Sequence, residues 1–386
     1  MAQRLDTVII GGGAMGSATA WSLARRGHSV TLLEQFGPGH RRGASYGASR
    51  NLSPAYADAD YLRLLAEALP LWSALEAESG TTVFSPTGVV NHGPNASWAT
   101  VHDALHRFGL DAVFLEPEAA SERWAGIRFD GRVLFTPQGG QLNADTALRA
   151  FQAVAAASGA EVRHGARVVA LRIAGDDEVH LTVQTAEGTE QLVARTVVVA
   201  AGAWTAKLLD GAVPLPRLTV TQEQPAHFVI ADAGAAWPGF NHRPDPGSPG
   251  YDYWYSGVYG MLTPGEGVKA GWHAVGPVVD PDHRDFTAEP VQLRALQRYA
   301  REWLPGVDAD SLVDVSCTYT LTDDENFVLD RIGPIVVGAG FSGHGFKFTP
   351  AVGRVLADLV LGEAAAPEFF SAARPRAGSL FRAARD

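Results

Sequence analysis

The beginning of the chain alternates between apolar runs and a glycine-rich turn. A β-branched run at residues 8–10 leads into the turn, an amphipathic segment follows at residues 18–26, and a second apolar run at residues 30–33 ends on Glu34. Short β-branched runs beside glycine are typical of buried strands, whereas apolar residues at helical spacing indicate a helix. The pattern therefore predicts a strand, a tight turn, a helix and a second strand, which together make a βαβ unit.

The glycines of this unit predict a dinucleotide site. Gly11, Gly13 and Gly16 occupy the G-x-G-x-x-G positions between the first strand and the helix. The first glycine permits the turn, the second lets the backbone approach a pyrophosphate, and the third lets the helix pack closely on the strand. Glu34, about 20 residues further on, is placed to accept hydrogen bonds from ribose hydroxyls and disfavours a 2′-phosphate. FAD and NAD both remain possible at this point.

Apolar periodicity predicts the other main elements of the chain. Helices are predicted at residues 60–78, 99–108, 143–158, 290–303 and 350–361. Strands are predicted at residues 161–170 and 180–185, and buried strands at residues 196–204 and 335–340. The strand at 196–204 ends in small residues, which indicates that its carboxyl end lies close to a ligand.

The order of these elements predicts two domains. We expect the dinucleotide-binding domain to be discontinuous, with residues 1–80, 137–213 and 331–386. The second domain is expected to comprise residues 81–136 and 214–330, of which residues 214–314 are rich in proline, glycine and aromatic residues. Alternating short strands in that composition indicate a mostly antiparallel sheet.

Composition narrows the class of protein. The chain has 386 residues, of which 46% are hydrophobic and 19% charged, as in a soluble globular protein with a large core. Its net charge of -11 argues against nucleic acid and anionic membrane surfaces as partners. No apolar run approaches the length of a membrane span, and no secretory segment precedes the first predicted strand. We therefore expect a cytoplasmic protein.

Two residue types are rare enough to be informative. Cys317 is the only cysteine, which excludes an internal disulfide and argues against a metal site built on cysteine. A lone cysteine is otherwise most often a small buried hydrophobe. Lysine occurs only as Lys207, Lys269 and Lys347, while arginine supplies the remaining basic charge. Each lysine is therefore a candidate for a specific role.

A second glycine-rich strand-to-helix turn contains Gly343, His344 and Gly345. Backbone N–H groups in such a turn, together with the following helix N-terminus, stabilise an anion. A reduced flavin carries negative charge that this site would stabilise, whereas a nicotinamide does not need it. The alternative is an ordinary connection between a strand and a helix.

Residues 316–320, 323–330 and 340–348 resemble the C-terminal signature of the monomeric sarcosine oxidase family, which includes N-methyl-amino-acid oxidases and related amine oxidases. The resemblance covers essentially the whole chain, and residues 43–50 resemble the family's flavin-contacting loop. It implies an α/β fold of the D-amino-acid oxidase type. A Rossmann-like FAD-binding domain is joined to a second α+β substrate domain that is built on a large, mostly antiparallel sheet.

The resemblance implies a role for each of several residues. Cys317 matches the position at which the family attaches FAD through an 8α-S-cysteinyl thioether, and Lys269 matches the lysine that activates dioxygen beside the flavin. Arg50 matches an arginine over the flavin face, with Ser49 beside it, and Lys347 matches the lysine that pairs with the substrate carboxylate.

His273 and Tyr259 match residues of the family's substrate pocket, so the predicted catalytic residues are Lys269, His273, Arg50, Lys347 and Tyr259. The predicted cofactor-binding set combines the glycine motifs with the resemblance: Gly11, Gly13, Gly16, Glu34, Ser45, Ser49, Arg50, Val168, Gly202, Cys317, Gly343, His344, Gly345 and Lys347. Lys207 matches no functional position and is expected at the surface. No metal site is predicted.

Ser53 departs from the family pattern. It occupies the position of an arginine that clamps the substrate carboxylate, and a serine cannot form a bidentate charged contact. The loss of that arginine is expected to weaken sarcosine binding by several kcal/mol if the substrate carboxylate stays desolvated. Arg243 is a possible replacement. The aromatic segment 251–255 either lines an enlarged pocket or packs within a sheet. Because the arginine is replaced and the first interpretation enlarges the pocket, we expect a cyclic or aromatic amine larger than sarcosine.

The resulting hypothesis is FAD-dependent oxidation of the C–N bond of a secondary amine, which yields an imine and hydrogen peroxide. The expected partners are a small amine and dioxygen, without nucleic acid or membrane, and the chain is expected to be a monomer. Three alternatives remain open: an FAD-dependent dehydrogenase or desaturase with another electron acceptor, an NAD-linked dehydrogenase, and a flavin-binding protein without turnover.

Overall fold

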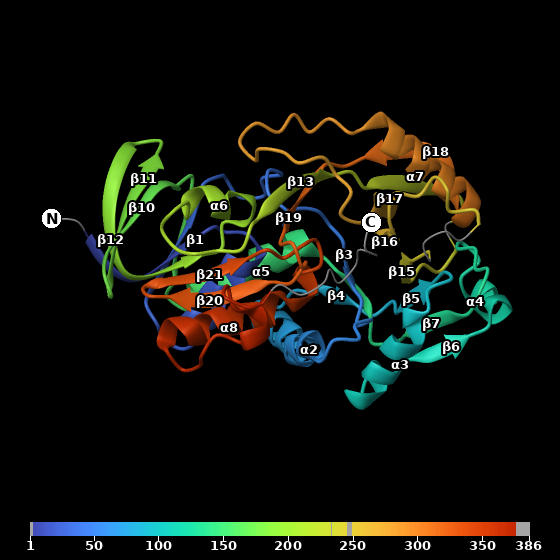
Figure 1. Cartoon of the computed structure of the whole chain (residues 1–386), viewed down its shortest axis with the longest axis horizontal. Helices are drawn as coiled ribbons and strands as arrows, with labels where there is room; N and C mark the ends of the chain where they lie inside the picture. Colours follow the sequence, from blue (N-terminus) through green and yellow to red (C-terminus); the bar gives the residue numbers. More distant parts are fainter. Residues whose placement is uncertain (1–2, 233, 245–248, 376–386) are drawn as a thin grey trace.

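Residues 3–232, 234–244 and 249–375, which the computed structural model describes, contain two large sheets with smaller strands between them (Figure 1). Within these residues the first sheet has eight strands in the order β10-β11-β12-β1-β2-β9, and β21 pairs with β12 and with β20. Its strands are β1 (Gln3–Ile10), β2 (Val30–Glu34), β9 (Glu161–His164), β10 (Arg167–Gly175), β11 (Glu178–Thr185), β12 (Gly188–Val199), β20 (Val328–Ile332) and β21 (Ile335–Ala339).

The middle of the first sheet is parallel, as a Rossmann-like domain requires. β1 pairs in parallel with β2 and β12, β2 pairs with β9, and β12 pairs with β21. The strand predicted at residues 161–170 is in fact two strands, and this prediction was wrong. The chain turns at Gly165, where φ is 69°, so that β9 joins β2 while β10 pairs with β11. Glycine permits that left-handed backbone at little cost.

Alternate residues of β1 enter two different cores because successive side chains on a strand point to opposite faces. Ile9 packs with helices α1 (Ala14–Ala24), α2 (Ala59–Ser79), α5 (Ala144–Ala157) and α8 (Thr349–Leu361), which cover one face. Val8 and Ile10 enter the apolar cluster on the other face.

Helix α1 is more deeply buried than an amphipathic helix. All of its residues are buried, because α5 and α8 both pack against it, and the predicted polar side at Arg25 and Arg26 lies just beyond its end. A Cβ added at Gly353 of α8 would lie 2.5 Å from the backbone carbonyl carbon of Ala18. This close approach of two helix backbones explains the small residues on both helices.

The second sheet follows the order β18-β14-β17-β16-β15-β5-β7-β6, and its described pairs are antiparallel except for β5 with β15. The predicted mostly antiparallel sheet is therefore confirmed. Helix α7 (Pro290–Trp303) packs against it, and α3 (Ser97–Arg107) and α4 (Pro117–Arg123) lie near its β6 edge (Figure 1). Its strands are β5 (Val89–His92), β6 (Val113–Leu115), β7 (Val133–Thr136), β14 (Ala226–Ile230), β15 (Gly239–His242), β16 (Val258–Thr263), β17 (Gly267–Trp272) and β18 (Val307–Asp314).

Short strands lie between the two large sheets (Figure 1). β3 (Arg50–Leu52) and β4 (Phe84–Ser85) pair with β8 (Gly140–Leu142), and β13 (Thr219–Glu223) pairs with β19 (Cys317–Leu321). β19 thus places Cys317 between the sheets. The exact domain boundaries stay a prediction. β20 belongs to the first sheet and begins at Val328, whereas the last segment of the first domain was expected to begin at residue 331.

Among the described residues, none of the helices combines the length and the apolar character that a membrane span needs.

Candidate active site

The glycine turn after β1 is packed so tightly that side chains are excluded. A Cβ at Gly11, whose φ is 107°, would lie 2.5 Å from the carbonyl oxygen of Ala200. A Cβ at Gly16 would lie 1.9 Å from the carbonyl oxygen of Gly11. The turn leads directly into α1, whose N-cap is Gly13, and the N-terminus of a helix is a position that favours a phosphate.

Glu34 ends β2 beside this turn and is 5% exposed. Its Oε2 accepts a hydrogen bond from the backbone N–H of Gly12 at 2.7 Å, and its Oε1 accepts one from Phe36 at 2.9 Å. These bonds fix the carboxylate next to the turn. A carboxylate has further lone pairs, so the contacts leave capacity for a ribose hydroxyl.

One cavity of about 1990 Å³ runs from the glycine turn to the second sheet. Pockets for drug-sized ligands typically measure about 300–1,000 Å³, so this one has room for a dinucleotide together with a substrate. Every predicted site residue except Gly16 lines it: Gly11, Gly13, Glu34, Ser45, Ser49, Arg50, Val168, Gly202, Tyr259, Lys269, His273, Cys317, Gly343, His344, Gly345 and Lys347. Gly16 does not line the cavity, because it lies within helix α1.

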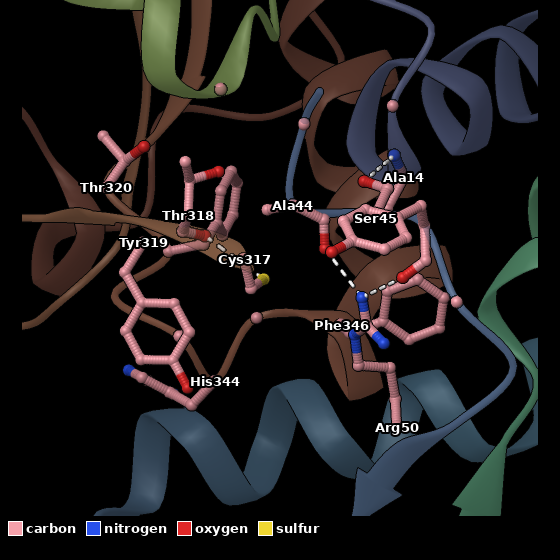
Figure 2. Close-up of a pocket in the computed structure, with 18 of the residues that line it drawn as sticks. Ala14, Ala44, Ser45, Arg50, Cys317, Thr318, Tyr319, Thr320, His344 and Phe346 are labelled. Atoms are coloured by element: carbon pink, nitrogen blue, oxygen red, sulfur yellow. Dashed lines mark hydrogen bonds between the residues drawn. The ribbon is translucent and has the colours of Figure 1, made fainter. Parts of the chain in front are cut away.

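The loop at residues 43–50 is held along one side of the cavity. The Arg50 guanidinium donates to the carbonyl oxygens of Ala44, Tyr46 and Ser49 at 2.8, 2.6 and 2.7 Å, and it lies 5.6 Å from the centre of the Phe346 ring. Figure 2 shows this arginine turned back onto its own loop. Arg50 therefore shapes the loop as well as bringing positive charge to the cavity.

Lys269 reaches the cavity from β17 and is 8% exposed. Its Nζ donates to the carbonyl oxygen of Ser49 at 2.8 Å. Burial, and then the charge of Arg50, lower the pKa of Lys269 to about 7. His227 is its partner across the β14–β17 pair, and burial and Lys269 lower the pKa of that histidine to about 4, so it is neutral near pH 7.

Cys317 is half-buried at the start of β19. Figure 2 shows its sulfur directed into the space between its own strand and the segment that carries Ala44, Ser45 and Arg50. Ser316, the residue before Cys317, is held by two hydrogen bonds. Arg284 donates to Ser316 Oγ at 2.8 Å, and the hydroxyl of Tyr46 donates to the Ser316 carbonyl oxygen.

Lys347 occupies another part of the cavity and is 7% exposed. Its Nζ donates to the Tyr56 hydroxyl at 3.0 Å and to the His344 carbonyl oxygen at 2.9 Å. Burial, and then the charge of Arg243, lower the pKa of Lys347 to about 7. Burial and Lys347 hold the pKa of His344 well below its usual range, so the ring is neutral and lies 3.0 Å from the Tyr56 hydroxyl through Nδ1.

Tyr259 and His273 meet at Tyr319, which sequence reasoning missed. Burial raises the pKa of Tyr259 and that of Tyr319, and each tyrosine is close enough to influence the pKa of the other. The His273 and Tyr319 rings lie 5.5 Å apart, and all three residues line the cavity.

Ser53 is buried at the edge of the cavity, where its Oγ lies 3.3 Å from Asn241 Nδ2. Arg243 lines the same cavity. Both interpretations of the aromatic segment apply, because Tyr251, Trp254 and Tyr255 line the cavity while Trp254 also packs against aromatic residues of the second sheet and α7. Lys207 is exposed, as expected, and paired with Asp280 and Asp282.

Sequence reasoning also missed Tyr56 and Arg284. Tyr56 lies in the segment between β3 and α2, far along the chain from Lys347. Arg284 belongs to the abundant arginines, so neither its type nor its spacing marked it. Both residues are identified only by their contacts in the folded protein, Tyr56 with Lys347 and Arg284 with Ser316.

A sequence profile of the family described as FAD dependent oxidoreductase matches residues 6–359. The chain belongs to this family. The expected family resemblance, the fold class and the dependence on FAD are therefore confirmed.

Named relatives agree along nearly the full length. The peroxisomal sarcosine oxidase of Mus musculus is 35% identical over 92% of this chain and 91% of its own. The monomeric sarcosine oxidase of Bacillus sp. strain NS-129 is 31% identical over 93% of both chains. Among solved structures, NikD, described as an unusual amino acid oxidase essential for nikkomycin biosynthesis, is similar with a TM-score of 0.83, at 28% identity over 99% of this chain and 100% of its own.

The residues present fit FAD. The crowded glycines make a backbone cradle at the start of α1, the cavity is large enough for a dinucleotide, and Cys317 directs its sulfur into that cavity. The turn at Gly343 adds a second close approach, because a Cβ there would lie 2.1 Å from the Tyr319 ring. Both glycine-rich turns found in the sequence therefore belong to one site.

Proposed function

We propose that this FAD-dependent oxidoreductase oxidises the C–N bond of a secondary amine to an imine, with dioxygen as electron acceptor and hydrogen peroxide as the second product. The observation that carries this proposal is the placement of two buried lysines on one cavity. Lys269 is bound to the loop that carries Arg50, and Lys347 is bound to Tyr56 and His344. When bound, FAD would accept a hydride equivalent from the carbon next to the amine nitrogen.

Lys269 serves the oxygen side in this proposal. A buried ammonium stabilises negative charge that develops on dioxygen, because the low dielectric strengthens the attraction and the group is already in place. Its bond to the Ser49 carbonyl holds the ammonium at one position. Dioxygen is therefore expected to react beside Lys269.

Lys347, Tyr56 and His344 serve the substrate side. The neutral His344 ring holds the Tyr56 hydroxyl through Nδ1. The Tyr56 hydroxyl and the His344 carbonyl oxygen accept hydrogen bonds from Lys347 Nζ and hold the ammonium in one orientation, and burial lowers its pKa to about 7. An anionic substrate group would raise that pKa and keep the lysine charged. The reacting amine itself must be neutral to give up a hydride, so anaerobic substrate oxidation is expected to speed up as pH rises.

Cys317 is proposed to carry the cofactor through a thioether. Attachment replaces the thiol S–H and one C–H of the flavin 8α-methyl group by a C–S bond, and the two protons and two electrons removed reduce dioxygen to hydrogen peroxide. Arg284 donates to the hydroxyl of Ser316, which holds the residue before Cys317 in place and so positions the sulfur. We further propose that the protein is a cytoplasmic monomer.

The decisive experiment is anaerobic bleaching of the purified yellow protein by a panel of cyclic and N-methyl amines, with and without a carboxylate. Bleaching by at least one secondary amine supports the proposal. Peroxide formed in a one-to-one ratio with product under air supports an oxidase, whereas bleaching without peroxide indicates a dehydrogenase. A colourless protein that takes up no FAD would overturn the proposal. Failure of every amine would favour a flavin-binding protein without turnover.

A further inference from the structure

We propose that His227 and Thr263 are positioning residues of the oxygen side, and that they act on Lys269 through one buried chain of hydrogen bonds. The inference rests on the proposed function and adds the residues that stand behind the lysine. The Thr263 hydroxyl lies 3.1 Å from His227 Nε2 and 2.6 Å from Ser49 Oγ. The carbonyl oxygen of Ser49 then accepts a hydrogen bond from Lys269 Nζ at 2.8 Å. The lysine is therefore held by a residue that is itself held from the second sheet.

Three neighbouring strands of the second sheet bring these side chains together. β17 lies between β14 and β16, and Lys269 on β17 is paired with His227 on β14 and with Met261 on β16. Side chains of directly paired residues share a face of the sheet, and so do residues two apart on one strand. Thr263 lies two residues beyond Met261 on β16. Lys269, His227 and Thr263 therefore project from the same face.

The chain of hydrogen bonds is withdrawn from solvent. Ser49, Thr263 and His227 are all buried, and so is Lys269. A buried polar group that loses its partner cannot bind water instead, so each group is restricted to the geometry that keeps its partner. The carbonyl oxygen that holds the lysine therefore has little freedom to move while the chain is intact.

Glu266 sets the direction of the hydrogen bonds. It belongs to the turn between β16 and β17, and its Oε2 lies 3.6 Å from His227 Nε2. A carboxylate accepts hydrogen bonds and cannot donate them, so it favours the histidine tautomer with hydrogen on Nε2. His227 then donates to Thr263, and Thr263 donates to Ser49. The neutral ring adds no second positive charge beside Lys269.

Packing is the alternative explanation for this chain. Buried hydroxyl groups are nearly always hydrogen-bonded, so the same contacts could serve only the stability of the sheet. The two roles differ in what the loss of a hydroxyl changes. A structural role predicts lower stability alone, whereas a positioning role predicts slower reoxidation in a protein that is still folded.

The first measurement follows the reoxidation by dioxygen of FAD-loaded protein that light and EDTA have reduced, so no amine is needed. Thr263→Val keeps the shape of the side chain and removes both hydroxyl contacts. It should slow reoxidation by about 10- to 100-fold, the range that a displacement of about 1 Å can cost. Thr263→Ser and His227→Gln each keep a hydrogen-bonding group at the same place and should retain most of the native rate.

The effects of the two positions should not add. His227→Leu should lose about as much as Thr263→Val, and the double variant no more than either, because both changes break one chain. Thr136→Val is the matched control. Thr136 is a buried threonine of β7 in the same sheet, its hydroxyl donates to the Val89 carbonyl oxygen at 3.1 Å, and it does not line the cavity. This control should keep the native reoxidation rate even where it lowers stability.

A second measurement needs neither dioxygen nor an amine. Protein labelled with ¹³C at the lysine Cε gives only three lysine signals in an NMR spectrum, from Lys207, Lys269 and Lys347. Thr263→Val should shift the Lys269 signal and leave the other two in place, because only Lys269 is held through Ser49.

The outcomes separate this inference from the proposed function. When reoxidation depends on Lys269, the inference is overturned if folded Thr263→Val and His227→Leu keep the native rate, or if Thr136→Val loses as much as they do. If Lys269→Met is reoxidised as fast as native protein, it is the proposed oxygen chemistry that fails. The lysine signal then decides the inference alone, and a Lys269 signal that Thr263→Val leaves unshifted overturns it.

Discussion

Lys269→Met tests the oxygen side of the site. Lys269 is 8% exposed, and burial together with Arg50 lowers its pKa from 10.5 to about 7. Since one pKa unit corresponds to about 1.4 kcal/mol, the site disfavours the charged ammonium by about 5 kcal/mol when no anion is near. An anion that forms beside the lysine recovers part of this energy. The Lys269 ammonium therefore gains a favourable interaction mainly when negative charge develops on dioxygen beside it.

The methionine variant is expected to be reoxidised by dioxygen about 100- to 1,000-fold more slowly, which is the usual cost of removing one preorganised donor. Its anaerobic reduction by substrate should change much less. In the native protein, reoxidation should slow as pH rises above about 7, because the ammonium loses its proton. Negative charge on the reduced cofactor raises the pKa of Lys269 and moves this decline upward.

Stopped-flow mixing of the reduced enzyme with dioxygen, from about pH 6 to about pH 10, spans both the lowered and the ordinary lysine pKa. Lys269→Met should give a flat profile. Lys269→Arg is the matched control, because arginine keeps its charge over the whole range and should remove the decline. Equal losses in both half-reactions of Lys269→Met would refute the assignment, as would native reoxidation that does not depend on pH.

Three further predictions concern other parts of the site. Gly16→Ala should abolish FAD binding or folding, because its Cβ would lie 1.9 Å from the Gly11 carbonyl oxygen; a yellow, stable variant would contradict the tight turn. Cys317→Ser should release its flavin on acid precipitation, whereas native protein keeps it and shows the added mass on the peptide that contains Cys317; free flavin from native protein would exclude the thioether. Lys347→Met should raise the unfolding free energy of cofactor-free protein at pH 7, because the pKa of Lys347 is lowered to about 7 and its charge opposes folding most below that pH. In urea titrations the native protein should gain stability from pH 7 to pH 10 and the variant less, and identical curves would contradict the lowered pKa.

The first glycine turn could be predicted from the sequence because its causes are local. The β-branched run is followed by Gly11, whose φ of 107° favours glycine, and by Gly16, whose Cβ would lie 1.9 Å from the Gly11 carbonyl oxygen five residues earlier. Cys317 and Lys269 stood out because cysteine and lysine are almost absent from the chain. The structure brings both residues to one cavity, although their chemical roles stay proposals.

The substrate side could not be predicted in this way. Residues 53 and 56 share one segment, whereas residues 243 and 347 lie on two others. Arginine is the ordinary basic residue of this chain, so the sequence named Arg243 only as a possibility and could not place it in space. Its place on the same cavity as Lys347 depends on how β15 pairs with β5 and on how the second sheet lies against the first domain. Backbone sterics act between neighbours and can be seen in a motif, whereas the convergence of charges depends on long-range packing.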